Sequence, residues 1–90
     1  MSEDEKIFVG SKPLMAYVTA IMTSFQSVDS VNIMARGRAI SSAVDVVEVI
    51  KRSFISDVTI DDIKIGTERL GETGAERNVS SIMIKLSKPK

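Results

Sequence analysis

Cysteine and histidine are both absent from this 90-residue chain. Without cysteine the chain has no disulfide, no thiolate nucleophile and no zinc site built on sulfur. Without histidine it lacks the usual general base and the commonest metal ligand. We therefore expect a protein that is not an enzyme and that uses no cofactor and no metal.

The chain also lacks an excess of positive or negative charge: 12 Lys and Arg residues balance 12 Asp and Glu residues, so the formal net charge is zero. Any anion binding must then come from local clusters of charge. No apolar run approaches the roughly 20 residues of a membrane helix, and the acidic start Met1–Lys6 is unlike a secretory leader. We expect a cytoplasmic protein with no membrane partner, one domain over residues 1–90, and disorder in residues 1–5.

Apolar residues recur with strand spacing and helix spacing in turn along the first part of the chain. Ile7–Val9 is a short apolar run, and Pro13–Gln26 carries one apolar stripe of helical period. Val31–Arg36 alternates like a strand, and Ala39–Phe54 has helical period again. With two later strands the order is β-α-β-α-β-β, which predicts an α/β fold.

The last third of the sequence predicts a bent hairpin. Alternation in Val58–Ile65 changes phase at Asp61 and Asp62, which predicts a bulge inside one long strand. A second change of phase between Val79 and Ile82 predicts a matching kink in the final strand. The intervening segment, residues 70–76, contains two glycines and no apolar anchor beyond Leu70, so we expect the tip of a projecting, mobile arm. The register of the hairpin does not follow from the sequence.

The second predicted helix has a wider apolar arc than a single sheet would cover. Val44, Val46 and Val49 broaden its main stripe. Valines left in water are unfavourable, at roughly 25 cal/mol for each Å² of apolar surface. We therefore predict a subunit interface that includes Val46 and Val49.

Two arginines flank a glycine where the second predicted strand meets the second predicted helix. The planar guanidinium groups of Arg36 and Arg38 suit phosphate, and Gly37 permits a tight turn between them. Lys12 lies at the preceding strand-to-helix turn, where free helix N–H groups would assist it. Ser11 either caps that helix or joins a phosphate site. An ordinary solvated loop is the alternative for the arginines.

Motifs along nearly the whole chain resemble those of the Alba family of archaeal chromatin and nucleic-acid-binding proteins. The resemblance is carried by Val9-Gly10-Ser11-Lys12-Pro13 and, most specifically, by Ala35-Arg36-Gly37-Arg38-Ala39-Ile40-Ser41. Further matches are Ala43-Val44-Asp45, Val47-Glu48, Arg52-Ser53-Phe54 and Asn78-Val79-Ser80-Ser81-Ile82.

The resemblance implies a two-layer α/β sandwich that dimerises and grips the nucleic-acid backbone with the loops after its first two strands. Lys12, Arg36 and Arg38 fall on the basic positions of the family. The protruding hairpin, with Arg69 and Arg77, would extend along a groove. Phe54 matches an aromatic residue that lies where neighbouring dimers meet on DNA.

Three departures from the family pattern bear on the strength and control of binding. Ser11 replaces a lysine that is a target of regulatory acetylation, so this control is in question here. Met34 stands where members commonly have lysine. Glutamates accompany the arginines of the arm, at positions Glu68, Glu72 and Glu76. The last two departures should weaken DNA binding.

The sequence thus predicts a homodimeric, chromosome-associated protein that binds double-stranded DNA largely without sequence specificity and compacts or protects it. An RNA-binding protein or ribonucleoprotein subunit is the first alternative, because Alba relatives also bind RNA and the positive charge is reduced. A third possibility is an interaction subunit that pairs with a more basic paralogue through its wide apolar helix face.

Overall fold

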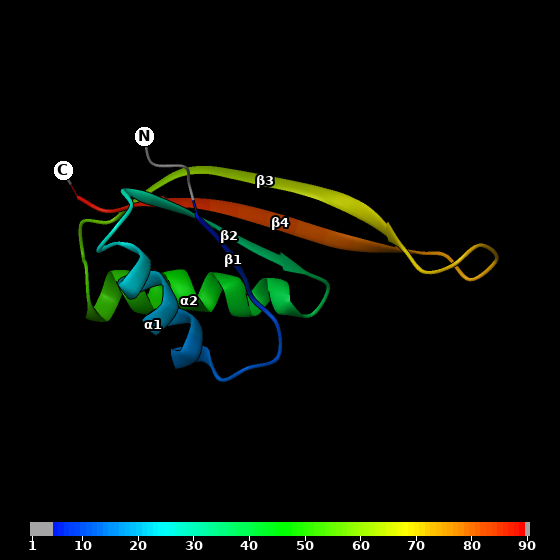
Figure 1. The fold of residues 1–90 in the computed structure, drawn as a ribbon, viewed down its shortest axis with the longest axis horizontal. Coiled ribbons are helices and arrows are strands. Elements are labelled where there is room, and N and C mark those ends of the chain that lie inside the picture. The colour runs from blue at the N-terminus through cyan, green and yellow to red at the C-terminus, as the bar shows by residue number, and fades with distance from the viewer. Residues whose placement is uncertain (1–4, 90) are drawn as a thin grey trace.

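Six elements follow one another in the computed structural model, which describes residues 5–89 (Figure 1). The strands are β1 (Glu5–Phe8), β2 (Ser30–Arg36), β3 (Thr59–Leu70) and β4 (Arg77–Ser87), and the helices are α1 (Leu14–Ser24) and α2 (Ala39–Ser53). The predicted order is confirmed.

The four strands form one mixed sheet in the order β1-β2-β4-β3. β1 pairs parallel with β2, whereas β4 pairs antiparallel with both β2 and β3. The last strand of the chain is therefore central, and β3 lies at an edge.

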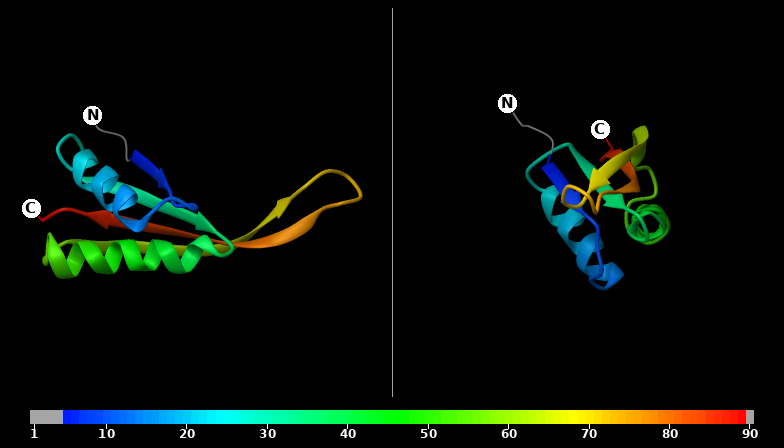
Figure 2. Two further views of the ribbon diagram at one scale, coloured as in Figure 1. Left: turned by 90° about the horizontal axis from the view of Figure 1, so that it is seen from below. Right: turned by 90° about the vertical axis from the view of Figure 1, so that its right-hand side faces the viewer.

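Both helices cover the same face of the sheet and produce a two-layer sandwich (Figure 2). α2 turns a stripe of buried residues with helical spacing toward β2 and β4, and α1 packs beside it. The core between the layers includes Ile21, Ile33, Ile50 and Leu86, all fully buried.

One part of the apolar arc of α2 lies inside this core. Val46 is 0% exposed and packs against the sheet, so its side chain is not available to a second subunit. Val49 is half-buried against the core, and Val44 is the valine of α2 that is exposed. The arc is wide because two surfaces, α1 and the sheet, cover it within the same chain.

β3 and β4 continue past the helices as a two-stranded arm, which contributes to a longest dimension of 48 Å (Figure 1). Leu70 pairs with Arg77, so the tip comprises residues 71–76, one residue fewer than the predicted range 70–76. Gly71 has φ +109°, and a Cβ there would lie 2.6 Å from the carbonyl oxygen of Ala75, so the tip requires glycine.

The predicted bulge in β3 is confirmed. Ile60 pairs with Leu86 and Asp62 with Lys85, which leaves Asp61 as the extra residue. The Ser87 hydroxyl donates a hydrogen bond to the Asp61 carboxylate.

The matching kink predicted for β4 is wrong, because within the described strands the register of β4 shifts only opposite Asp61. Val79 and Ile82 point to opposite faces of a regular strand. Val79 is half-buried beside the turn at Gly37, where a Cβ added to the glycine would lie 3.5 Å from Cγ1 of Val79.

The ends of the predicted elements differ slightly from the observed ones. Glu5 is the first residue of β1, and its carboxylate accepts a hydrogen bond of 2.8 Å from the Ser24 hydroxyl, so the expectation of disorder is wrong for this residue. Residues 1–4, the rest of that expectation, lie outside the described range. Within residues 5–89, neither helix has the length and apolar character needed to cross a bilayer.

Candidate nucleic-acid interface

The turns that follow β1 and β2 lie side by side at one end of the sheet. The two strands are parallel, with Phe8 opposite Met34, so both leave the sheet at the same edge. Ser11, Arg36 and Arg38 line one shallow hollow of about 400 Å³, and the exposed Lys12 follows in the same turn as Ser11. The structure therefore brings two turns together whose residues are 24 or more positions apart in the sequence.

Gly37 fixes the turn between the two arginines. Its φ of +56° is left-handed, a conformation that costs other residues roughly 1–2 kcal/mol. Its amide donates to the carbonyl oxygen of Ser80 on β4 at 2.8 Å, and its carbonyl accepts from the amide of Ile40 at 3.2 Å. Arg36 and Arg38 are thus held on either side of a turn that is fastened to the sheet.

The N-terminus of α2 opens into the same hollow. Arg38 is the N-cap residue, and within the described chain no side-chain hydrogen bond caps this end and no acidic residue occupies its first turn. Ala39 and Ser42 of that turn line the hollow with the arginines. Because free N–H groups and the helix dipole give this end a partial positive charge, they add to the attraction for an anion.

The turn that carries Lys12 is held by a residue that the sequence did not single out. The buried Tyr17 hydroxyl accepts hydrogen bonds from the amides of Gly10, at 2.8 Å, and of Lys12, at 3.0 Å. Pro13, not Ser11, is the N-cap of α1, and no side-chain cap is present there in the described chain. The sequence does contain one signal that could have identified Tyr17: it precedes Ile21 by four residues and so lies at the margin of the apolar stripe of α1.

Replacing Tyr17 by phenylalanine should lower the free energy of unfolding by roughly 1–3 kcal/mol, because two partly buried amides lose their acceptor while the ring stays in place. Denaturant unfolding measures this change. Thr19→Ala, at an exposed position of the same helix, should change stability by less than about 0.5 kcal/mol. A Tyr17→Phe protein as stable as the unaltered chain would contradict this role of the hydroxyl.

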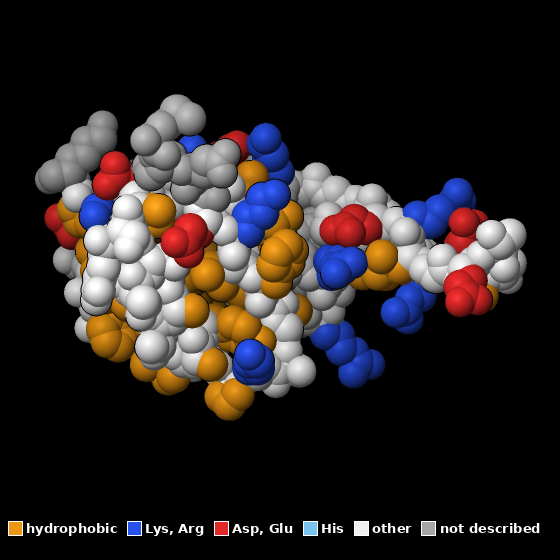
Figure 3. Space-filling model, in the orientation of Figure 1, with side chains coloured by type: hydrophobic (Ala, Val, Ile, Leu, Met, Phe, Trp, Pro, Cys, Tyr) orange, Lys and Arg blue, Asp and Glu red, His pale blue; other side chains and the backbone are white. Residues whose placement is uncertain are grey.

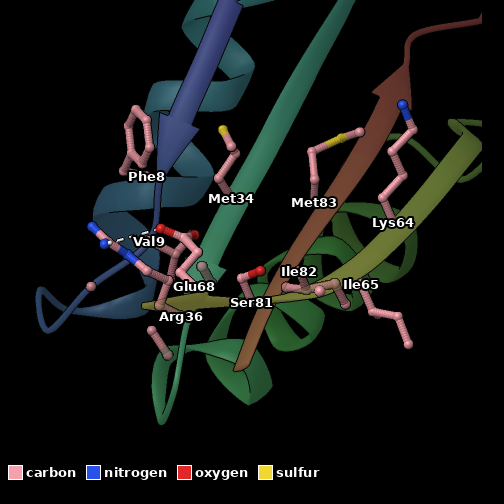
Figure 4. Close-up of a pocket in the computed structure, with 14 residues that line it drawn as sticks. Phe8, Val9, Met34, Arg36, Lys64, Ile65, Glu68, Ser81, Ile82 and Met83 are labelled. Carbon is pink, nitrogen blue, oxygen red and sulfur yellow. Dashed lines mark hydrogen bonds and ion pairs between the residues drawn. The ribbon is translucent and has the colours of Figure 1, made fainter. Parts of the chain in front are cut away.

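Arg36 also contacts a carboxylate of its own chain. Its Nη1 lies 3.4 Å from Oε1 of Glu68 on β3, and both side chains are about half exposed (Figure 4). An exposed ion pair of this length contributes little to stability, typically about 0–1 kcal/mol. Arg36 can therefore exchange Glu68 for a phosphate at low cost, although Glu68 competes for it.

The two arginines of the arm point to opposite faces. Arg69 pairs with Asn78 and Arg77 with Leu70, so adjacent rungs of the ladder carry them. Basic and acidic side chains are interleaved along the arm (Figure 3). The arm thus offers cations on both sides without forming a uniformly positive surface.

An exposed apolar strip lies on the helix side of the sheet, where β3 extends beyond the cover of the helices. Ile63 pairs with Ile84 and Ile65 with Ile82, so both isoleucines face the same side as the core. They are 52% and 82% exposed, and Val44 on α2 is also exposed. Phe54, exposed as well, follows the other end of α2. The sequence indicated the alternation of β3 but not its position at the sheet edge.

These features define a class of small two-layer α/β proteins. In this class the cationic turns and the base of a hairpin arm lie at the same end of the molecule. A family model described as Alba matches residues 5–67. The chain belongs to the Alba family, and the resemblance found in the sequence is confirmed.

Relatives match over nearly their full length. The chain is 55% identical, over 98% of its own length and all of the other protein, to a protein named DNA/RNA-binding protein Alba from Methanothrix thermoacetophila. It is 49% identical to DNA/RNA-binding protein Alba 1 from Archaeoglobus fulgidus, with coverage of 94% and 97%.

Solved structures bear out the fold. The structure titled Alba from Thermoplasma volcanium matches with a TM-score of 0.87 and 45% identity, over 93% of this chain and all of that one. ALBA1 from Trypanosoma brucei matches with a TM-score of 0.72 and 25% identity, over all of this chain and 74% of that one. The predicted α/β architecture with a C-terminal hairpin is confirmed.

Proposed function

We propose that this chain is a non-enzymatic protein that binds nucleic acid mainly through backbone phosphates, without reading sequence. One observation carries the proposal: Ser11, Arg36 and Arg38 line a single hollow at the N-terminus of α2. Arginine forks and free N–H groups contact phosphate oxygens, which are the same for every base pair. Relatives named as DNA/RNA-binding proteins support the same conclusion.

The binding unit is a homodimer that doubles this cationic end. The strip formed by Ile63 and Ile65 on β3 is the surface that a second copy covers, because these two large apolar side chains would otherwise remain in water. Lys12, Arg36 and Arg38 from two subunits then provide six cations. The arms, with Arg69 and Arg77, extend the contact along the nucleic acid.

The role that follows is compaction or protection of chromosomal DNA in the cytoplasm. Dimers bound side by side meet through Phe54, whose ring is exposed at the end of α2 opposite the arginine turn. RNA is the second candidate ligand, because the names of relatives include it and the arm carries glutamates among its arginines. Competition between duplex DNA and structured RNA at one salt concentration separates the two.

The test of the proposed function is the salt dependence of binding to duplex DNA. Six phosphates neutralised by a dimer predict a slope of log K against log salt of about −5, from roughly −0.9 per contact. Fluorescence anisotropy of a labelled duplex at several salt concentrations measures the slope. A slope near zero would contradict the proposed function.

Glu68→Gln should tighten duplex binding, because Arg36 then has no carboxylate competing with phosphate. We expect an increase of roughly two- to fivefold at low salt, since an exposed pair of this kind is worth about 0–1 kcal/mol. Glu48→Gln, on an exposed position of α2, removes the same charge at a distance from the turn and should have a smaller effect. Equal gains in both variants would mean that only net charge matters.

A further inference from the structure

The sheet face opposite the helices carries a row of four side chains that the phosphate site does not use. Phe8 lies opposite Met34, Met34 opposite Met83, and Met83 opposite Lys64, so one side chain from each strand stands in line. Figure 4 shows these four side chains across the strands. Among the described elements, both helices lie on the other face (Figure 2).

This row has an apolar centre, with Lys64 at one margin and the Arg36–Glu68 pair near the other. The Phe8 ring is 64% exposed, and Met34 and Met83 are half-buried beside it. Lys64 ends the row on one side, and the Arg36 guanidinium, paired with Glu68, lies near its other side, at the C-terminal end of β2. An exposed aromatic ring with flexible thioethers and nearby cations is suited to a flat ligand that carries negative charge.

The row borders a hollow that continues into the phosphate site. Phe8, Met34, Met83, Lys64 and Arg36 belong to a hollow of about 490 Å³. Gly10, Arg36 and Ala39 line both this hollow and the smaller one at the N-terminus of α2. A strand whose phosphates lie at the arginine turn can therefore place its next base over the sheet without a gap.

We propose that this face binds the unpaired bases of a single-stranded nucleic acid. One base stacks on Phe8 and a neighbouring base lies on Met34 and Met83. Arg36 contacts a phosphate on the Phe8 side of the row, and Lys64 contacts one at the other end. A duplex keeps its bases stacked inside the helix and cannot present a base plane to the sheet, so the face distinguishes single strands from duplexes. Stacking accepts any base, because every base has a π face.

The inference rests on the proposed function, because Arg36 and its neighbours supply the backbone contacts. The two are separable by experiment. Absence of binding to both duplex and single strand by the unaltered protein would defeat the proposed function. Normal duplex binding combined with single-strand binding that does not depend on Phe8 would defeat the inference alone.

The experiment compares Phe8→Ala, Phe8→Leu and Phe8→Tyr on a single-stranded oligonucleotide and on the duplex of the same sequence and length. Phe8→Ala and Phe8→Leu should weaken single-strand binding roughly tenfold, the order expected for the loss of one base–aromatic stack. Phe8→Tyr should retain it, and all three should bind duplex within about twofold of the unaltered protein. Ribose and deoxyribose forms of the strand identify which polymer is preferred.

Met15→Leu is the matched control, because Met15 is an exposed apolar residue on α1, away from the sheet face. Single-strand affinity should not change in this variant. Retained affinity in Phe8→Leu would overturn stacking, and equal losses on duplex and single strand would overturn the selectivity. A change in oligomeric mass in Phe8→Ala would assign the face to a protein contact and would also overturn the proposal.

A photocross-linking measurement tests the contact directly. An oligonucleotide with 5-iodouridine in the single strand, irradiated in complex with the unaltered protein, should give a peptide adduct at Phe8. Adducts confined to the arm or to the arginine turn would contradict the proposed position of the bases.

Discussion

Replacing Arg36 and Arg38 together by alanine should flatten the salt dependence of duplex binding from a slope of about −5 to about −2. The double variant removes four of the six cations of a dimer and leaves the two Lys12 side chains, each worth roughly −0.9. Between about 50 and about 200 mM salt the unaltered protein should lose roughly 10³-fold in affinity, and the variant only about tenfold. Anisotropy titrations at four or more salt concentrations measure both slopes.

The matched control for this experiment is Lys51→Ala/Arg52→Ala. These residues belong to the last turn of α2, whereas Arg38 caps its first turn, so the same number of charges is removed from the opposite end of the helix. The slope of the control should remain near that of the unaltered protein. If both double variants flatten the slope equally, binding follows overall charge and not the hollow. Because Arg36 and Arg38 are exposed, denaturant midpoints should be unchanged.

Ile63→Glu should convert the proposed dimer into a monomer. In a symmetric interface the substitution buries two unpaired carboxylates, each at a cost of several kcal/mol, so the dimer should weaken by more than about 10³-fold. Sedimentation or light scattering should give a mass near the 9.8 kDa of one chain. The salt slope should fall to about half, because each monomer presents only its own three cations.

Met15→Glu is a close control for Ile63→Glu, since the two residues are 50% and 52% exposed in the single chain. It introduces the same charge at an exposed apolar position on α1 and should leave the protein dimeric. A dimer that survives Ile63→Glu would show that the strip on β3 is not the subunit contact. If sedimentation of the unaltered chain alone gives the mass of a monomer, the chain does not self-associate. That result would favour pairing with a more basic paralogue.

The order of elements could be predicted from the sequence because each is read from local periodicity. The stripe of α1, the alternation of β2 and the phase change at Asp61 all reflect which face a residue buries. The order of strands in the sheet is set by contacts distant in sequence, such as β2 with β4, and no local pattern encodes it. The kink predicted near Val79 was wrong for the same reason: Val79 lies beside the turn at Gly37, which is 42 residues away in the sequence.

The cationic part of the candidate site was accessible from the sequence because the types of residue carry the chemistry. Arg36 and Arg38 flank a glycine that needs a left-handed turn, and that requirement is local. Tyr17 as acceptor for two amides and Glu68 as competitor for Arg36 depend on tertiary proximity. Val46 appeared to be a surface valine because helical periodicity alone does not reveal how many neighbours surround a helix.

Among the strands of residues 5–89, β3 lies at the edge of the sheet and pairs only with β4. An unpaired strand edge is a hazard in a protein that is present at high concentration. An exposed edge is a template for adding further strands, and repeated addition leads to fibrous aggregates. Here the extra residue Asp61 interrupts the ladder, and Asp62, Lys64 and Glu68 place charges along the strand. Copies of the chain that collide edge to edge therefore meet an irregular, charged border, which disfavours the addition of further strands.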